Sequence, residues 1–327
     1  LFRSRFEVSK KWYELKAKLL GVKKLAYHER MVEYGHLTQK YSYEESCSLV
    51  SKVFNNLDSE FGKIFDGFVK NRQIDVYPKK GKTGGAFCAA GGLNLPTYIL
   101  LNHTDKFQDV STLAHEAGHG VNDELMKSNL DALNFGSPLS TAEVASTFME
   151  DFVTDEVAKE ADDQMRLAIM VKKMDDDVAT IFRQVACYLF EKELHKEFRE
   201  KGYLSKEVIG EIFQKNMGAY MGPAVEMSEG SENWWVYWGH IRNFFYVYSY
   251  ASGLLISKSL QNSVKKDHKF IDKVKIFLSS GSKSSPKEIF ANIEIDITDG
   301  KFWEAGVKEM ETLLVETEKL ARKLGKI

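Results

Sequence analysis

Proline is so scarce in this chain that long helices dominate what it can fold into. The 327 residues include five prolines, and the stretches 139–222 and 224–285 contain none. Because proline removes a backbone donor and clashes with the preceding turn of a helix, its absence permits long uninterrupted helices. Both stretches carry Leu, Met, Lys, Glu and Phe at helical spacing, and so do residues 7–20 and 43–70. The sequence therefore predicts a mainly α fold.

Residues 73–102 interrupt this helical pattern. They contain three short β-prone runs, 74–77, 86–90 and 97–101, which are separated by Gly, Pro and Asn. Runs of this kind predict a strand followed by a hairpin. We expect a small sheet that lies directly ahead of a helix over residues 109–126.

The composition narrows the classes of partner. Lys and Arg number 45 against 47 Asp and Glu, and a formal net charge of -2 gives no electrostatic reason to expect nucleic acid or an anionic membrane as partner. No apolar run approaches the ~20 residues that cross a bilayer, and the charged first residues do not resemble a signal peptide. Three cysteines at unrelated spacings, Cys47, Cys88 and Cys187, predict no disulfide framework and favour a reducing compartment, so we expect a cytoplasmic protein.

The pentapeptide His115-Glu116-Ala117-Gly118-His119 is an HExxH motif inside the helix predicted over residues 109–126. Two histidines at i and i+4 lie one turn apart on the same face, where both imidazoles can reach one metal ion. Glu116 points about 100° round the helix, beside the metal, where it can serve as general base to a bound water.

The same pattern would also arise in an amphipathic helix with two surface histidines. Apolar residues around the motif, among them Val110, Leu113 and Val121, argue against a solvated face. Buried histidines need polar partners, and one metal ion can serve as the partner of both. Gly118 costs about 1 kcal/mol against Ala inside a helix, which is best tolerated where another backbone comes close.

A catalytic zinc takes three protein ligands and keeps one position for water. The candidate third ligand is Glu143, although Ser140-x-x-Glu143 also reads as a capping box at a helix start. Glu150 and Asp151 are alternatives on the same predicted helix. Glu150 lies two turns beyond Glu143 on the same face, where it could hydrogen-bond a ligand imidazole instead. Spacing alone does not separate these possibilities.

With Glu143 24 residues beyond the last histidine of HEAGH, the chain resembles peptidase family M3, most closely its oligoendopeptidase F branch. The resemblance also covers residues 74–87, 98–116 and 240–253. It implies that His115, His119 and Glu143 bind one zinc ion per chain and that Glu116 is the catalytic base. It further implies one catalytic domain over residues 1–327, a channel-forming helical peptidase that acts on short peptides.

Two departures from the family pattern accompany this resemblance. Members of the branch are nearly twice as long and carry an N-terminal helical region that forms one wall of the channel. We expect that wall to be absent here or supplied by another chain. The second departure is Arg242, where the family usually carries an aromatic residue two positions after the histidine. It bears on the substrate contacts and leaves the metal site unaffected.

Zinc peptidases also stabilise the oxyanion that forms when water attacks an amide carbonyl, and a neutral Tyr or His donor contributes. The segment 234–256 is the natural source of such donors. If it is helical, Tyr246 and Tyr250 share a face and Tyr248 points elsewhere. An aromatic stripe at this spacing is also typical of a core. With the resemblance, we expect His240 and Tyr250 to be catalytic, and Tyr246 and Tyr248 at most to contact substrate.

The stretch Gly84-Gly85-Ala86 ahead of residue 87 has two readings. It could be part of an edge strand that presents its backbone to an extended peptide, or it could be a plain hairpin turn. On the first reading these three residues contact the substrate, and they do so without regard to its sequence.

We expect a zinc-dependent endopeptidase that hydrolyses short unstructured oligopeptides by Glu-assisted attack of a zinc-bound water. One alternative is a metallocarboxypeptidase of a related helical HExxH fold, which needs a cationic residue to hold the terminal carboxylate. The other is a non-catalytic protein that binds zinc or peptide without turnover.

Overall fold

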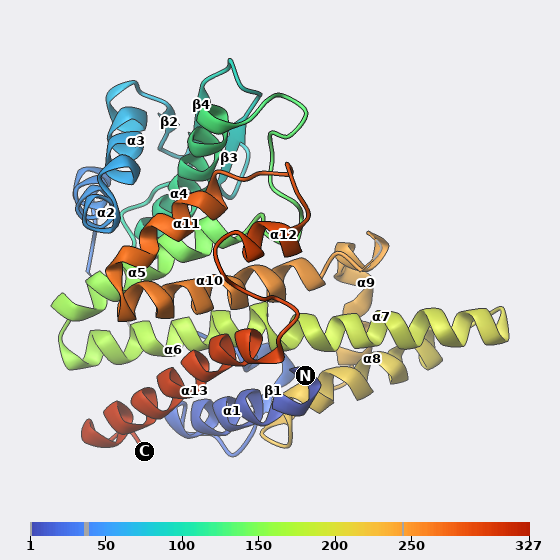
Figure 1. The fold of residues 1–327 in the computed structure, drawn as a ribbon. Coiled ribbons are helices and arrows are strands. Elements are labelled where there is room, and N and C mark those ends of the chain that lie inside the picture. Colours follow the sequence, from blue (N-terminus) through green and yellow to red (C-terminus); the bar gives the residue numbers. More distant parts are fainter. Residues whose placement is uncertain (1, 36–38, 244) are drawn as a thin grey trace. The chain divides into compact units, whose positions relative to one another are not determined.

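The computed structural model describes residues 2–35, 39–243 and 245–327 and is mainly helical (Figure 1). The described chain divides into two compact units. The first unit comprises Leu1–His36, Asp162–Leu255 and Val307–Ile327, and the second comprises Leu37–Ala161 and Ile256–Gly306. The prediction of one catalytic domain over residues 1–327 stays a prediction, and each unit is described below by itself.

The first unit consists of helices and one short pair of parallel strands. Its elements are α1 (Phe6–Leu19), β1 (Leu25–Ala26), α6 (Asp163–Thr180), α7 (Phe182–Lys201), α8 (Lys206–Met221), β5 (Val225–Glu226), α9 (Trp234–Tyr237), the start of α10 (Tyr248–Lys266) and the end of α13 (Gly300–Lys323). Strand β1 pairs with β5.

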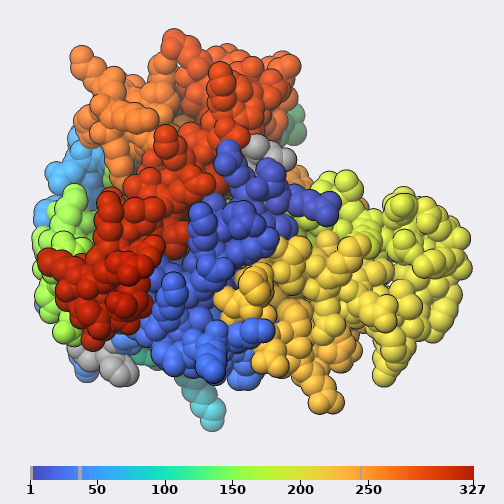
Figure 2. Space-filling view, turned by 90° about the horizontal axis from the view of Figure 1, so that it is seen from below, coloured from blue at the N-terminus to red at the C-terminus, as the bar shows by residue number. Residues whose placement is uncertain are grey.

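Helix α1 is held to its neighbours by buried polar contacts. Ser9 Oγ donates to the carbonyl of Tyr220 on α8 at 2.7 Å, and Figure 2 shows the blue N-terminal segment against the yellow segment that contains α8. Toward α6, Trp12 Nε1 donates to Asp175 at 3.0 Å and Lys16 Nζ donates to the same carboxylate at 2.6 Å. Because buried polar groups without partners are costly, these contacts fix how the helices pack.

The second unit combines helices with a small sheet. Its elements are α2 (Tyr43–Leu57), α3 (Ser59–Lys70), β2 (Ile74–Asp75), β3 (Phe87–Ala90), β4 (Thr97–Leu100), α4 (Phe107–Asn129), α5 (Val144–Glu160), the rest of α10, α11 (Ile271–Leu278), α12 (Pro286–Ala291) and the start of α13. Helix α4 packs against β3, β4 and α5 (Figure 1).

The three-stranded sheet confirms the predicted strand and hairpin. Its order is β2-β4-β3, with β4 parallel to β2 and antiparallel to β3. Ile99 in the central strand pairs with Ile74 on one side and with Cys88 on the other, and it is almost fully buried. The sheet therefore leaves β3 as an end strand directly against the helix that carries the HExxH motif.

One predicted helix is divided in the structure. The pattern over residues 43–70 predicts one continuous helix, but α2 ends at Leu57 and α3 begins at Ser59. Asp58 between them is extended, and its side chain accepts a hydrogen bond from the backbone N–H of Glu60. An aspartate at an N-cap supplies an acceptor that a helix interior cannot use, which explains why the hydrophobic pattern alone missed the break.

Among the described residues, no helix is both long and apolar enough to cross a membrane.

Candidate active site

Helix α4 presents both histidines of the motif on one face. The ring centroids of His115 and His119 lie 5.1 Å apart, and each side chain is about one quarter exposed. The neighbouring Leu113, Ala117 and Val121 are fully buried in the core of the second unit. The helix is thus fixed by packing while the imidazoles remain accessible, so the reading of two solvated surface histidines does not describe this face.

Glu143 meets both histidines. Its Oε2 atom lies 3.4 Å from the Nε2 atoms of His115 and His119, and the three ligand atoms all lie within 4.8 Å of one another. Ligands about 2.0–2.1 Å from a tetrahedral zinc ion are separated from each other by about 3.3 Å. The two separations from Glu143 to the histidines are close to this value, so the donor set fits a tetrahedral zinc ion.

The position of Glu143 in its helix decides between two readings of the sequence. Helix α5 begins at Val144, so Glu143 is its N-cap residue. A capping box with Ser140 at the N-cap would instead place Glu143 at the third helical position. That reading is wrong for α5, and Oε2 of Glu143 points to the histidines.

Gly118 explains how α5 comes so close to α4. A Cβ atom at this position would lie 2.8 Å from the carbonyl oxygen of Ala145 and 2.8 Å from Cα of Ser146. Real Cβ atoms do not approach backbone so closely, so only glycine permits this packing. The expectation that a backbone lies close to Gly118 is confirmed. In the same turn, Ser146 Oγ donates to Glu143 Oε2 at 3.0 Å and helps to orient the carboxylate.

The two acidic alternatives to Glu143 have other partners. Glu150 Oε2 lies 2.9 Å from Nδ1 of His115, the ring nitrogen that faces away from Glu143. A carboxylate there holds the proton on Nδ1 and leaves Nε2 free to bind a metal. Asp151 is bound by Gln261 Nε2 at 3.0 Å and lies 3.6 Å from Lys258 Nζ. The structure thus places Glu150 behind a candidate ligand and Asp151 away from the group.

We call His115, His119 and Glu143 the metal group. In the absence of an ion, these side chains shift the pKa values of one another. Burial by itself lowers the pKa of His115, but hydrogen bonds to Glu143 and Glu150 outweigh it and raise that pKa to about 10. Burial raises the pKa of Glu143, yet hydrogen bonds to the two histidines bring it below its usual range. A bound cation would therefore replace a proton that this carboxylate pair holds on His115.

Glu116 is buried beside the metal group, with 7% of the residue exposed. Burial raises the pKa of its carboxyl above the usual value, and the backbone N–H of Cys88 on β3 donates to it. A raised carboxyl pKa favours a group that accepts a proton and later returns it. The sequence did not predict the contact with Cys88, because it depends on how an end strand lies against α4. Glu116 lies 28 residues after Cys88 in the chain.

Cys88 is also near a second acid on α4. Its Sγ atom lies 3.7 Å from Oδ2 of Asp123, and burial raises the pKa of Asp123 to about 6. Desolvation raises the pKa of the thiol as well. The cysteine therefore behaves as a packed neutral group at the edge of the site.

The three residues Gly84, Gly85 and Ala86 precede β3, which begins at Phe87. Gly85 has φ +79, a conformation that favours glycine, and Asn102 Nδ2 donates to its carbonyl at 2.8 Å. They form a loop at the entrance to the end strand, so the reading of an edge strand applies only from Phe87 onward. Their contact with substrate stays a prediction.

The first unit holds the other predicted site residues. Tyr250 Oη and Nε2 of His240 are 2.8 Å apart, and the Tyr246 ring lies 5.2 Å from His240 and 5.6 Å from Tyr250. We call these three residues the donor cluster. Tyr248 is 45% exposed and no ring contact to the cluster is found for it in the described chain. Tyr246 and Tyr250 therefore lie together and Tyr248 lies apart from them, as predicted. The catalytic roles of these residues stay predictions.

The donor cluster is not built as one helix. The predicted segment 234–256 contains α9, a 3-10 turn at Gly239–Arg242 and the start of α10 at Tyr248. Tyr246 and Tyr250 are brought together by the turn into α10 and not by a continuous helical face. Arg242 is exposed and donates to the carbonyl of Trp238 at 3.3 Å.

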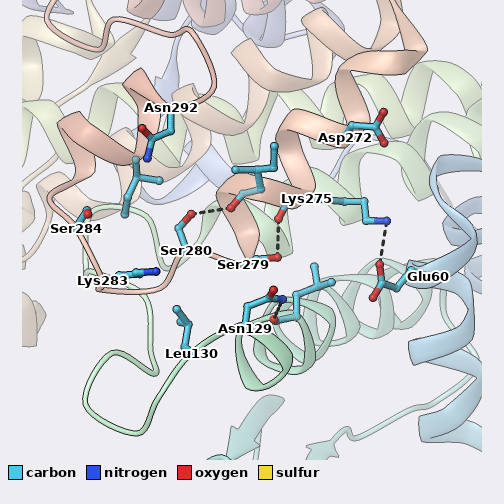
Figure 3. A pocket seen from close by; sticks show the side chains of 13 residues that line it. Glu60, Asn129, Leu130, Asp272, Lys275, Ser279, Ser280, Lys283, Ser284 and Asn292 are labelled. Carbon is cyan, nitrogen blue, oxygen red and sulfur yellow. Dashed lines mark hydrogen bonds and ion pairs between the residues drawn. The ribbon is translucent and has the colours of Figure 1, made fainter.

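A cavity of about 680 Å³ lies elsewhere in the second unit, between the end of α4, α11 and α12 (Figure 3). Lys275 there is paired with Asp58 and Glu60, at 3.1 and 2.9 Å. Ser279 and Ser280 follow α11 and donate to backbone carbonyls of that helix. None of the predicted site residues lines this cavity, so its volume gives no guide to the chemistry.

Comparisons with known proteins cover most of the chain. The sequence profile described as "Peptidase family M3" matches residues 7–309. An oligoendopeptidase F homolog of Borreliella burgdorferi is 29% identical over 94% of this chain and 53% of its own length. Oligopeptidase PepF of Bacillus subtilis is 28% identical over 87% of this chain and 43% of its own length. The chain thus spans about half the length of the curated relatives it matches.

Solved structures show the same fold. Oligoendopeptidase-F from Enterococcus faecium superposes with a TM-score of 0.72 at 20% identity, over 98% of this chain and 51% of that one. PZ peptidase A, solved with an inhibitor, superposes with a TM-score of 0.79 at 19% identity, over 96% of this chain and 57% of that one. The predicted helical architecture with a small sheet is confirmed.

Proposed function

Because the chain belongs to peptidase family M3, we propose that it is the catalytic half of a zinc-dependent endopeptidase that hydrolyses short, unstructured oligopeptides. The observation that carries this proposal is the convergence of Glu143 on both histidines at 3.4 Å, with one face of the group left accessible. The names of the curated relatives, oligoendopeptidase F and oligopeptidase PepF, support the substrate class.

His115, His119 and Glu143 would hold the ion, and Glu150 would orient His115 through Nδ1. When bound, zinc supplies Lewis acidity, which makes a water acidic near neutral pH and polarises a carbonyl. The donor set, two neutral imidazoles and one carboxylate, is of the type that catalytic zinc sites use.

Glu116 would take a proton from the attacking water and pass it to the leaving amine. Its buried carboxyl, held by the Cys88 N–H, is fixed in orientation and has a pKa raised toward the range where both steps proceed. His240 and Tyr250 would donate hydrogen bonds to the oxyanion that forms on the carbonyl. The end strand β3 offers backbone groups to an extended peptide, with residues 84–86 at its entrance.

We further propose that a region corresponding to the unmatched half of the relatives, on the same chain or on another, completes the substrate channel. A cytoplasmic location agrees with the cysteine usage.

The test is hydrolysis of a fluorescence-quenched peptide blocked at both ends, with and without a zinc chelator. Cleavage that the chelator abolishes and zinc restores supports the endopeptidase. Cleavage of only the unblocked form, one residue from its C-terminus, identifies the metallocarboxypeptidase instead. Peptide or zinc binding without cleavage identifies the non-catalytic alternative. Glu116→Gln is the matched control, since it keeps the shape of the site and removes the base.

A further inference from the structure

The segment that carries the donor cluster contains a strained residue. Phe245 has φ +62, in the left-handed region that side chains with a Cβ rarely adopt. Such a conformation persists only where the surroundings over-determine it. Phe245 stands directly before Tyr246, and its carbonyl accepts the N–H of Tyr248, the first residue of α10, at 3.4 Å. Its conformation therefore sets the direction in which the chain enters α10 and places Tyr250.

Helix α7 supplies the contacts that hold this residue. The backbone N–H of Phe245 donates to Oε1 of Glu191 at 3.4 Å. The Phe245 ring lies 5.4 Å from the ring of Tyr188 and 5.3 Å from that of His195. Positions 188, 191 and 195 follow one face of a helix, so a single stripe of α7 grips both the backbone and the side chain of Phe245.

Glu191 is an unusual residue for this place. It is 1% exposed, and its Oε2 atom has no hydrogen-bond partner in the described part of the chain. Burial raises its pKa above the usual value. A buried carboxyl with a single acceptor bond is costly compared with an apolar side chain of the same size. A purely structural position in a helical core would be filled better by Met or Leu.

We propose that Glu191 is a positioning residue, which holds Phe245 in its left-handed conformation and thereby keeps His240 and Tyr250 in the geometry needed to stabilise the oxyanion. This inference rests on the proposed function for the role of the donor cluster. The anchoring itself is a property of the first unit and does not depend on catalysis.

The central experiment compares three variants of the full chain. Glu191→Met keeps the volume and removes the acceptor, whereas Glu191→Gln keeps a carbonyl oxygen that can accept the same N–H. Glu200→Met is the control, since Glu200 is an exposed glutamate on the same helix. Each variant is measured by hydrogen–deuterium exchange of residues 239–250 and by kcat and KM on the quenched peptide.

For Glu191→Met we expect faster exchange in residues 239–250 and a fall in kcat of about tenfold, with KM changed by less than about twofold. A positioning role predicts this split, because the oxyanion contact strengthens only in the transition state. Glu191→Gln should restore both readings to near the wild type, and Glu200→Met should change neither. Wild-type exchange and kcat in Glu191→Met, or no rescue by Glu191→Gln, would overturn the proposal.

A double variant tests whether Glu191 acts through the donor cluster. If it does, adding Glu191→Met to Tyr250→Phe should lower kcat by much less than it does in the wild type. Full multiplication of the two losses would overturn the proposal. Should Glu191→Met fail to fold, Phe245→Gly provides the decision. Glycine adopts the left-handed backbone without support, so adding Glu191→Met to Phe245→Gly should leave exchange in residues 239–250 at the level of Phe245→Gly alone. A further rise would contradict the anchor.

The two proposals fail in different ways. If the wild-type chain does not cleave the peptide, the proposed function fails, while the exchange experiment still decides whether Glu191 anchors Phe245. If the wild type cleaves and the exchange of Glu191→Met is unaltered, the anchor fails and the proposed function stands.

Discussion

In the second unit, the metal group stands on α4 and at the N-cap of α5, two helices that are fixed by a fully buried core. In the first unit, the donor cluster lies on a 3-10 turn, on the residue after the strained Phe245 and on the first turn of α10. The metal group is set by the packing of regular elements, and the donor cluster by a few specific contacts to α7. Both groups bring side chains within hydrogen-bond reach, but by different physical means.

This difference corresponds to what each group must do. A metal site requires ligand atoms at separations fixed within a few tenths of an ångström, and regular helices deliver such precision. Donors to a developing charge must also let a peptide enter and leave, and loops and helix ends can open at smaller cost. We therefore expect perturbations of the metal group to change metal content and those of the donor cluster to change kcat.

The largest expected effect is that of Glu116→Gln. Glutamine keeps the shape of the side chain and a carbonyl oxygen that can accept the Cys88 N–H, but it cannot accept a proton. Peptidase activity should fall by about 10³-fold or more, the upper range for a general base. Metal analysis of the same preparation should show unchanged zinc. Substantial residual turnover would mean that the base lies elsewhere.

The second effect concerns zinc content. Removal of one of three ligands by Glu143→Ala should weaken zinc binding by roughly a thousandfold, whereas Glu150→Ala should weaken it by about 10–100-fold, as for partners of a ligand imidazole. Competition against a chromogenic chelator measures both. Equal losses from the two variants would contradict the ligand assignment and the view that regular packing sets this group.

The third effect separates the tyrosines. Tyr250→Phe removes the hydroxyl that contacts His240 and should lower kcat by about 10²-fold, with KM nearly unchanged. Tyr248→Phe is the matched control, because that side chain is exposed and outside the cluster. Steady-state kinetics on the quenched peptide decides between them. A fall at Tyr248 and none at Tyr250 would show that the donor cluster is not the oxyanion site.

The smallest effect, taken for each pH unit, is a pH dependence of metal binding. With a pKa of about 10 in the metal-free protein, His115 carries a proton near neutral pH that zinc must displace. Zinc affinity should therefore rise with pH, by about tenfold per unit from pH 6 to 9 for one released proton. Calorimetry in buffers of different ionisation enthalpy counts the released protons. Glu150→Gln should lower the pKa of His115 and flatten this slope, and an absence of proton release would refute the coupling.

The metal group was predictable from sequence to a greater extent than the donor cluster. The i, i+4 spacing of His115 and His119 dictates a shared helical face, and Gly118 indicates a close backbone in the same helix. Spacing alone left Glu143 open, because capping-box and ligand patterns share one spacing, and the family resemblance singled it out. The anchor between Phe245 and Glu191 could not be predicted, since it joins residues 54 positions apart through a backbone conformation that side-chain patterns do not record.

The missing Cβ of Gly118 has a consequence for how tightly this protein can hold an ion. Glu143 reaches the histidines because the backbone of α5 can advance to where that methyl group would stand. An added methyl in Gly118→Ala would push the two helices apart by some tenths of an ångström, and Glu143 would move away from the two histidines by a similar distance. The space left by this absent methyl group thus sets how close Glu143 comes to the two histidines.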